Sequence, residues 1–291
     1  MIQEASAVHH AVAASAVPAR VGPLPDPGNP MPASADTSRV QRRAPLRSIV
    51  GGSIGNLIEW YDFHVYTTFS VYFAAAFFPR ENRTVQLLSA AAIFALGFLL
   101  RPAGSWIIGR YADRHGRRAG LTLSVTLMCA GSLAIGVCPS YPQIGVSAPL
   151  VLLAARLVQG ASLGGEYGAS SVYLSEIAPP GRRGFFSSFH YVTLILGQLL
   201  ATGVQVVLQD MIFTPAQLNA WGWRVPFLIG AALALLAYWV RRNIDETPDF
   251  KELSATERHS SSLAELRRYP RSAWLVFGLT TGGTLAFFTY T

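Results

Sequence analysis

The sequence predicts an all-α polytopic membrane protein, in which six transmembrane helices form an amino-terminal bundle and an incomplete seventh helix follows. Of the 291 residues, 51% are hydrophobic and only 13% are charged, whereas soluble domains carry about 25% charged residues. The apolar residues form long runs, and a helix needs roughly 20 residues to cross a bilayer. These runs are not the alternating segments of about 10 residues that a membrane β-barrel requires, so the spans are predicted to be helices.

The segments follow one another in a simple order. Residues 1–44, rich in Ala, Ser and Pro, are predicted to be a flexible cytoplasmic tail, because they lack the basic and apolar regions of a signal peptide. The bundle is predicted over 45–241, with spans near 48–76, 84–110, 118–138, 149–175, 185–209 and 222–241. Residues 242–272 form a polar cytoplasmic central loop, in which 263–271 is either a short helix on the membrane surface or a solvated linker. Residues 273–291 begin a seventh span that the chain does not complete.

Basic residues predict the orientation of these spans. Lys and Arg are retained on the cytoplasmic side, and here they precede the first span and follow the second, fourth and sixth. The amino terminus is therefore expected in the cytoplasm and the protein in the inner (plasma) membrane. Dispersal of the +7 net charge over four loops also disfavours a nucleic-acid partner. The first three clusters are Arg39, Arg42, Arg43 and Arg47; Arg110, Arg114, Arg117 and Arg118; and Arg182 and Arg183.

Five charged residues fall inside the predicted spans: Glu59, Asp62, Arg101, Arg156 and Glu166. A charge in the membrane costs several kcal/mol unless it is paired or hydrated, so such residues are candidates for function. Two interpretations stay open. The charges could form buried salt bridges that hold the helices together, or the arginines could receive an anionic substrate while a carboxylate carries a proton. We favour the second interpretation.

Proton coupling would use an acid whose surroundings change. Burial favours the protonated carboxyl group and a nearby arginine favours the carboxylate, so movement between the two environments would load and release a proton. Glu59, Asp62 and Glu166 are all candidates, and the sequence does not choose among them. Tyr191 and Gln198 are candidates for orienting a substrate carboxylate, although such polar residues more often join helices to one another. Glycines at helical spacing, such as Gly97, Gly104, Gly160 and Gly164, predict close helix packing.

The loop from Gly109 to Arg118 resembles the signature between helices two and three of the major facilitator superfamily. It lies between two spans on the predicted cytoplasmic side. The resemblance implies a conformational latch, in which Asp113, Arg114, Arg117 and Arg118 form charge pairs with helix ends and with the following half in one state and break them in the other. A simple positive-inside anchor is the alternative.

Three further segments, 55–63, 101–104 and 156–168, narrow the resemblance to the metabolite:proton symporter family, and 175–184 and 221–227 fit it. The resemblance covers about residues 46–291. It implies two six-helix halves that move around a central site by alternating access, and segments 190–200 and 241–247 favour a dicarboxylate such as 2-oxoglutarate. This chain would supply the amino-terminal half and would need the missing carboxy-terminal half.

The resemblance also suggests roles and partners. Arg101, Arg156 and Arg224 are predicted to attract or bind the anion, with Arg224 near the outer face. The expected partners are a small organic anion, protons and the lipid bilayer, with the proton as coupling ion, no cofactor and no metal. An enzyme is disfavoured because no nucleophile with a paired base, metal-ligand cluster or phosphate-binding loop is found. Alternatives are symport of citrate, shikimate or a zwitterionic osmolyte, or a non-transporting membrane sensor or fragment.

Overall fold

The computed structural model describes residues 46–79, 82–247, 250–251 and 270–290. Helix is the only regular secondary structure within these ranges. The predicted tail 1–44 lies outside the described residues, as do most of the predicted central loop 242–272 and nearly all of the candidate surface helix 263–271.

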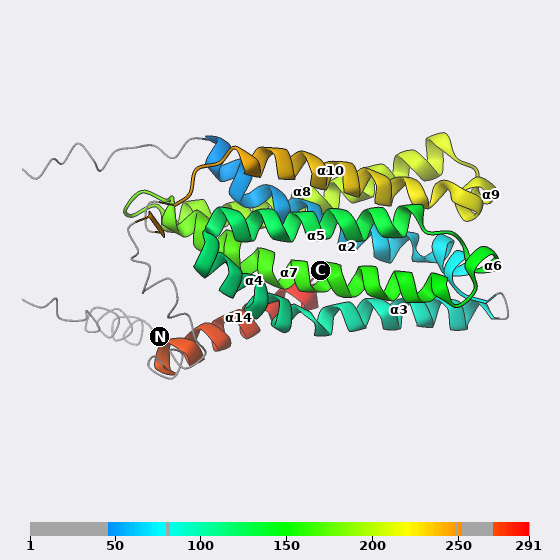
Figure 1. The fold of residues 1–291 in the computed structure, drawn as a ribbon, viewed down its shortest axis with the longest axis horizontal. Helices are drawn as coiled ribbons and strands as arrows, with labels where there is room; N and C mark the ends of the chain where they lie inside the picture. The colour runs from blue at the N-terminus through cyan, green and yellow to red at the C-terminus, as the bar shows by residue number, and fades with distance from the viewer. Residues whose placement is uncertain (1–45, 80–81, 248–249, 252–269, 291) are drawn as a thin grey trace, which may run out of the picture. The chain divides into compact units, whose positions relative to one another are not determined.

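The helices match the predicted spans closely (Figure 1). Short helical turns, α6 (Tyr141–Ile144), η2 (Val207–Ile212), α9 (Pro215–Gln217) and η3 (Leu218–Gly222), connect or extend the long helices. A further helix, α14 (Pro270–Tyr290), lies where the seventh span was predicted to begin. The long helices of the bundle are α2 (Leu46–Phe77), α3 (Arg83–Leu99), α4 (Arg101–His115), α5 (Arg117–Val137), α7 (Ser147–Glu176), α8 (Arg183–Val206) and α10 (Arg224–Arg242).

Five helical segments of the described chain are long and apolar enough to cross a membrane, judged by length and composition. They are Arg83–His115, Arg117–Val137, Ser147–Glu176, Arg183–Ile212 and Arg224–Arg242. Neither α2 nor α14 is among them. In α2, which is 32 residues long, Asn56, Glu59 and Asp62 interrupt the apolar sequence, and all three are buried. The polar residues of α2 therefore face other helices, and they lower its hydropathy without shortening it.

The second predicted span is broken at Leu100, between α3 and α4. Pro102, at the start of α4, has no N–H group to donate to the carbonyl four residues earlier, and a proline at this position interrupts a continuous helix. The Leu100 N–H instead bonds to the Gly97 carbonyl at 3.3 Å, in the tighter pattern of a helix end. The break places Arg101 at the first position of α4.

Glycines allow α7 to approach the second span closely, as predicted. A Cβ atom on Gly160 would collide with the Gly97 carbonyl oxygen, and one on Gly164 would collide with the Arg101 carbonyl oxygen. The most extensive packing joins α7 to α5 and α4, α5 to α10, and α2 to α8. Helix α7 thus links the second and third spans, and α2 lies against α8 and α10.

One end of the bundle is filled by aromatic side chains. Phe69, Phe73 and Phe77 lie on one face of α2 and are fully buried, and Trp223 packs against Phe73 and Phe77. The opposite end carries the α4–α5 turn and the last residues of α7 and α10. Between the two ends lie the charged residues of α2 and α7.

Candidate functional site

The structure places all three predicted acids in the bundle interior, but it does not gather them into one site. Glu59, Asp62 and Glu166 are 5%, 2% and 3% exposed. Asp62 and Glu166 each belong to a separate ion pair, whereas Glu59 belongs to none of the ion pairs among the described residues. The interpretation as buried salt bridges therefore suits Asp62 and Glu166, whereas the interpretation as a proton carrier suits Glu59.

Asp62 is held by groups from α5 and α7. The Arg156 Nη1 atom donates to Asp62 Oδ2 at 2.7 Å. Ser132 Oγ donates to Asp62 Oδ1 at 2.7 Å, and Gln159 Nε2 donates to the same oxygen at 3.0 Å. Arg156 Nη1 also donates to Gln159 Oε1 at 2.8 Å. Three helices thus meet at one carboxylate.

Aromatic rings pack against the Arg156 guanidinium. Its central carbon lies 4.1 Å from the Tyr66 ring centroid and 5.0 Å from that of Phe94. The Tyr66 hydroxyl donates to the Ala90 carbonyl at 2.8 Å, which fixes the ring. Such cation–π contacts stabilise a desolvated guanidinium. The Arg156 Nε atom is buried without a hydrogen-bond partner in the described part of the chain.

Glu166 pairs with Arg241, a residue that the sequence analysis did not select for the site. Arg241 Nη1 donates to Glu166 Oε2 at 2.8 Å, and Nη2 donates to Oε1. The remaining donors of this fully buried side chain reach the carbonyl oxygens of Gly51 at 3.0 Å and Leu121 at 2.5 Å. Ser124 Oγ donates to Glu166 Oε2 at 2.6 Å. This cluster connects α2, α5, α7 and α10.

The involvement of Arg241 had one signal in the sequence. Three acids and two arginines inside the spans leave one acid without a counter-charge. A long side chain at the end of a helix can extend its head group along the helix, and Arg241 is the next-to-last residue of α10. The glycine at position 55 makes room for the pair, because a Cβ atom there would collide with Arg241 Nη2 and Glu166 Oε1.

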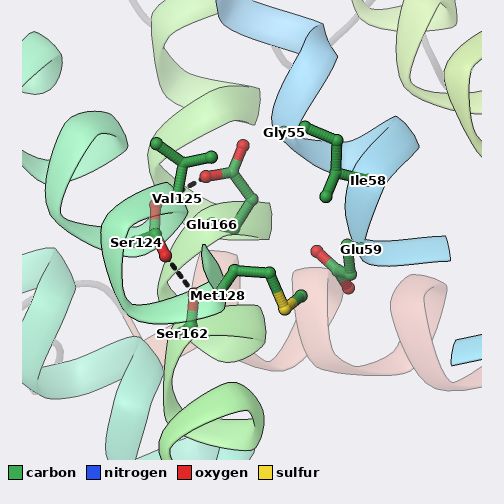
Figure 2. A pocket seen from close by; sticks show the side chains of 8 residues that line it. All are labelled: Gly55, Ile58, Glu59, Ser124, Val125, Met128, Ser162 and Glu166. Atoms are coloured by element: carbon green, nitrogen blue, oxygen red, sulfur yellow. Dashed lines mark hydrogen bonds between the residues drawn. The ribbon is translucent and has the colours of Figure 1, made fainter. Parts of the chain in front are cut away.

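Glu59 faces a small pocket rather than a partner (Figure 2). Its Oε2 atom is buried and accepts no hydrogen bond from the residues that the structure describes. The pocket has room on the scale of a single water molecule. Its lining residues come from α2, α5 and α7: Gly55, Ile58, Glu59, Ser124, Val125, Met128, Ser162 and Glu166.

Arg101, unlike Arg156 and Arg241, has no acidic partner among the described residues. No described carboxylate lies within ion-pair distance of Arg101. The half-buried guanidinium stacks on Phe98, with its central carbon 3.7 Å from the ring centroid. Glu59 on α2 and Arg101 on α4 are thus both without an ion-pair partner among the described residues.

The other predicted substrate ligands lie elsewhere. Tyr191 is 65% exposed on α8, and Gln198 is half-buried. Arg224 donates from Nη2 to the Cys138 carbonyl at 2.8 Å and stacks on Trp223. Arg224 is therefore attached to the end of α5 that is farther from Arg241. Its predicted role near the outer face, and the ligand roles of Tyr191 and Gln198, stay predictions.

The predicted latch residues form charge pairs at the α4–α5 turn. Arg117 bridges Asp113 and Glu176, with 3.2 Å between Arg117 Nε and Glu176 Oε1. The Arg118 side chain donates to the Arg242 carbonyl. Arg114 is exposed. These contacts connect the turn to the ends of α7 and α10. The role of the four residues as a conformational latch stays a prediction.

Glu246, which the sequence analysis did not select, caps the beginning of α5. Its carboxylate accepts from the backbone N–H of Arg117 at 2.9 Å and of Arg118 at 3.2 Å. An acid at this position compensates the unpaired N–H groups and the positive end of the helix dipole. Gly116 has φ 108°, and a Cβ atom there would collide with Glu246 Oε2. The glycine is therefore required for the cap.

The unpaired charges of the bundle interior are suited to binding ions. Across the described ranges, no group of three or more His, Cys, Asp or Glu side chains is arranged to hold a metal ion. The arrangement can instead bind an anion at Arg101 and a proton at a buried carboxylate.

Comparison with known proteins gives a consistent result. Residues 49–271 match the sequence model of a family described as sugar (and other) transporter. The chain is 52% identical over 255 residues to the alpha-ketoglutarate permease of Escherichia coli (strain K12), which covers 88% of this chain and 58% of the permease. It is 34% identical over 257 residues to a citrate-proton symporter of Klebsiella pneumoniae, covering 84% of this chain and 57% of the symporter.

Solved structures show the same fold. The xylose transporter XylE of E. coli, in a partially occluded inward-open conformation, superposes with a TM-score of 0.64 at 20% sequence identity, over 73% of this chain and 51% of the transporter. The chain thus spans little more than half the length of the curated relatives it matches.

Proposed function

The chain belongs to the sugar (and other) transporter family within the major facilitator superfamily, and on that premise we propose that it works in proton-coupled symport of an organic anion. The substrate we propose is a dicarboxylate such as 2-oxoglutarate. Transport would proceed by alternating access, with the bundle moving against a second, carboxy-terminal half around a site between them. The names of the relatives from E. coli and K. pneumoniae support an organic anion and a coupled proton.

The observation that carries this proposal is the free guanidinium of Arg101. Among buried or half-buried arginines of the bundle interior, Arg156 and Arg241 already have carboxylate partners. Arg101 has none within the described residues, and it lies at the break between α3 and α4 with part of its surface accessible. A guanidinium presents two parallel N–H groups that match a carboxylate. Arg101 is therefore the position where a substrate carboxylate finds an unoccupied donor pair.

The remaining residues support this site. The pair of Asp62 and Arg156 holds α2 against α7. Tyr191 and Gln198 would orient the far end of the anion, and Arg224 would attract it at the outer mouth. The Asp113, Arg114, Arg117 and Arg118 group would open and close at the other end of the bundle.

We further place the amino terminus in the cytoplasm and the protein in the inner membrane. The structure brings the basic α4–α5 turn together with the ends of α7 and α10, where Arg117 meets Glu176 and Arg118 meets the Arg242 carbonyl. Positive residues collect on the cytoplasmic side of membrane proteins. An even number of spans separates this end from the amino terminus, so both lie on one side.

Uptake of labelled 2-oxoglutarate into proteoliposomes tests the proposal. The 291-residue chain is compared with a form completed by the matching remainder of the E. coli relative, with and without an inward proton gradient. We expect gradient-driven uptake in the completed form, with competition by unlabelled 2-oxoglutarate stronger than by citrate, shikimate or betaine. Absence of uptake in both forms despite correct insertion would reject the proposal in favour of a sensor or another substrate.

Arg101→Lys supplies the residue-level test. A lysine keeps the charge but cannot donate two parallel hydrogen bonds to a carboxylate, so apparent affinity for 2-oxoglutarate should fall at least tenfold. Arg183→Lys, at the exposed start of α8, is the matched control and should leave affinity unchanged. Equal affinities for Arg101→Lys and the unmodified protein would show that Arg101 does not bind the substrate.

A further inference from the structure

The buried acids differ in what already occupies their carboxyl oxygens. Asp62 is in an ion pair with Arg156, and Glu166 is in an ion pair with Arg241. Glu59 is equally buried, yet its Oε2 atom has no hydrogen-bond partner among the described residues. A buried carboxylate without a partner is costly, whereas the neutral acid costs much less. Glu59 is thus the acid whose charge is removed with the smallest loss of contacts.

The two hydroxyl groups that line the pocket with Glu59 already have acceptors for their hydrogens. Ser162 Oγ donates its single hydrogen to the Ser124 carbonyl at 2.5 Å, and Ser124 Oγ donates to Glu166 Oε2 at 2.6 Å (Figure 2). Each hydroxyl has one hydrogen but two lone pairs. Within the pocket, an ionised Glu59 therefore finds no hydroxyl hydrogen that is not already directed to another acceptor. The pocket has room on the scale of one water molecule, which could accept a hydrogen bond from an O–H group on Glu59.

Arg101 is the interior arginine that has no carboxylate partner among the described residues, because Asp62 is in an ion pair with Arg156 and Glu166 is in an ion pair with Arg241. The three acids and three arginines of the interior balance in charge, and Glu59 and Arg101 are the two that are not in ion pairs. Arg241 acts on Glu59, but its donors are used by Glu166 and by backbone carbonyl groups. The titratable or charged groups that face Glu59 from the packed helices are Arg101 on α4, Glu166 and Tyr167 on α7, and Arg241 on α10.

We propose that Glu59 is the acid that takes up the coupled proton, and that its protonation prepares Arg101 to bind a substrate carboxylate. The inference rests on the proposed function and selects one acid from three. In the step, a Glu59 carboxylate oxygen gains a proton and forms an O–H bond, so the pair of Glu59 and Arg101 changes from net neutral to a net charge of plus one. An anion then meets a cation without a competing carboxylate. By reciprocity, a bound anion raises the affinity of Glu59 for its proton to the same degree.

Proton uptake on substrate binding measures this coupling directly. In whichever form of the protein takes up 2-oxoglutarate in the experiment above, substrate is added in weakly buffered detergent solution with a pH-indicator dye, at a series of pH values from neutral to alkaline. We expect proton uptake that rises with pH toward about one proton per 2-oxoglutarate bound, because Glu59 gains a proton on binding only where it is ionised beforehand. Glu59→Gln should bind 2-oxoglutarate with no proton uptake. Asp210→Asn, which removes an exposed acid in η2, just beyond the end of α8, should keep the proton uptake of the unmodified protein.

Transport modes separate failure of this inference from failure of the proposed function. Glu59→Gln should exchange labelled for unlabelled 2-oxoglutarate across the membrane but gain no acceleration from a proton gradient, whereas Glu59→Asp should retain some acceleration. If Glu59→Gln still responds fully to the gradient, Glu59 is not the coupling acid and the symport proposal stands. If the unmodified protein neither exchanges nor accumulates substrate, the symport proposal itself fails.

Infrared difference spectra provide a measurement that does not depend on folding of the Gln variant. Binding of 2-oxoglutarate to the unmodified protein should increase the carbonyl absorption of protonated carboxylic acid, and Glu59→Asp should shift that band. A difference spectrum without added carbonyl absorption, in protein that binds substrate, would overturn the inference.

Discussion

The Arg156 Nη1 atom lies 2.7 Å from Asp62 Oδ2, although the two residues are 94 positions apart in the chain. Their side chains are 7% and 3% exposed. The pair joins α2 to α7, which also pack directly on each other and share a hydrogen bond from Ser170 to the Gly52 carbonyl. It is therefore a structural contact within the interior that also holds Glu59 and Arg101.

Breaking this pair from one side should destabilise the bundle strongly. Asp62→Ala leaves the Arg156 guanidinium buried without its counter-charge, and removal of one partner of a buried ion pair costs about 3–5 kcal/mol. The double variant Asp62→Leu/Arg156→Met removes both charges and should recover most of that stability, but not substrate uptake. Thermal unfolding in detergent, followed by circular dichroism, measures the difference. Equal unfolding temperatures for the single and double variants would contradict this account.

Two adjacent arginines at the end of α10 should behave in opposite ways. Arg241→Gln leaves Glu166 without its ion pair and removes donors from the carbonyl groups of Gly51 and Leu121, so the expected loss of stability is again about 3–5 kcal/mol. Arg242→Gln changes an exposed side chain and should stay within about 0.5 kcal/mol. Thermal unfolding of the two variants in detergent, measured side by side, gives the loss of stability in each. A comparable loss in both would refute a special role for Arg241.

Helix contact through glycine should control the position of Arg101. A methyl group at Gly164 would collide with the Arg101 carbonyl oxygen, and overpacking of this kind typically costs about 1–3 kcal/mol. Gly164→Ala should therefore lower both stability and 2-oxoglutarate affinity, because α4 has to move away from α7. Gly168→Ala is the control, since the nearest atom to a Cβ there is Ser105 Oγ at 3.9 Å. Unaltered affinity in Gly164→Ala would separate the helix contact from the Arg101 site.

The cap on α5 should depend on the glycine that precedes it. Gly116 has φ 108° and ψ 154°, a backbone conformation that residues with a side chain adopt at a cost of about 1–3 kcal/mol. Gly116→Ala would also push Glu246 from the N–H groups of Arg117 and Arg118. We expect lower thermal stability and faster proteolysis after α10. Gly109→Ala, in open space within α4, should be neutral or slightly stabilising, and the same response at both glycines would argue against the cap.

Much of the fold could be predicted from the sequence because helix length and hydropathy are local properties. The ends of the predicted spans fall within a few residues of the observed helices, apart from the break at Leu100. That break also had a local signal in Pro102. Even α2, whose polar residues lower its hydropathy, was predicted correctly as a helix.

The candidate site could be predicted only in part. The sequence identified Glu59, Asp62, Arg101, Arg156 and Glu166, because charges inside apolar spans are conspicuous. It did not identify Arg241, Glu176 or Glu246, since each lies near a helix end, where a charge is ordinary in any membrane protein. Their roles depend on which neighbouring end they reach.

The sequence by itself determined which residues form the helices and which charges those helices carry. Only the tertiary structure decided how the charges are paired: Asp62 with Arg156, Glu166 with Arg241, and Glu59 with no ion-pair partner in the described chain. The physical reason is that pairing depends on the rotation and crossing of helices distant in sequence. Moving one residue along a helix turns a side chain by about 100°, and an ion pair forms only where two such directions meet.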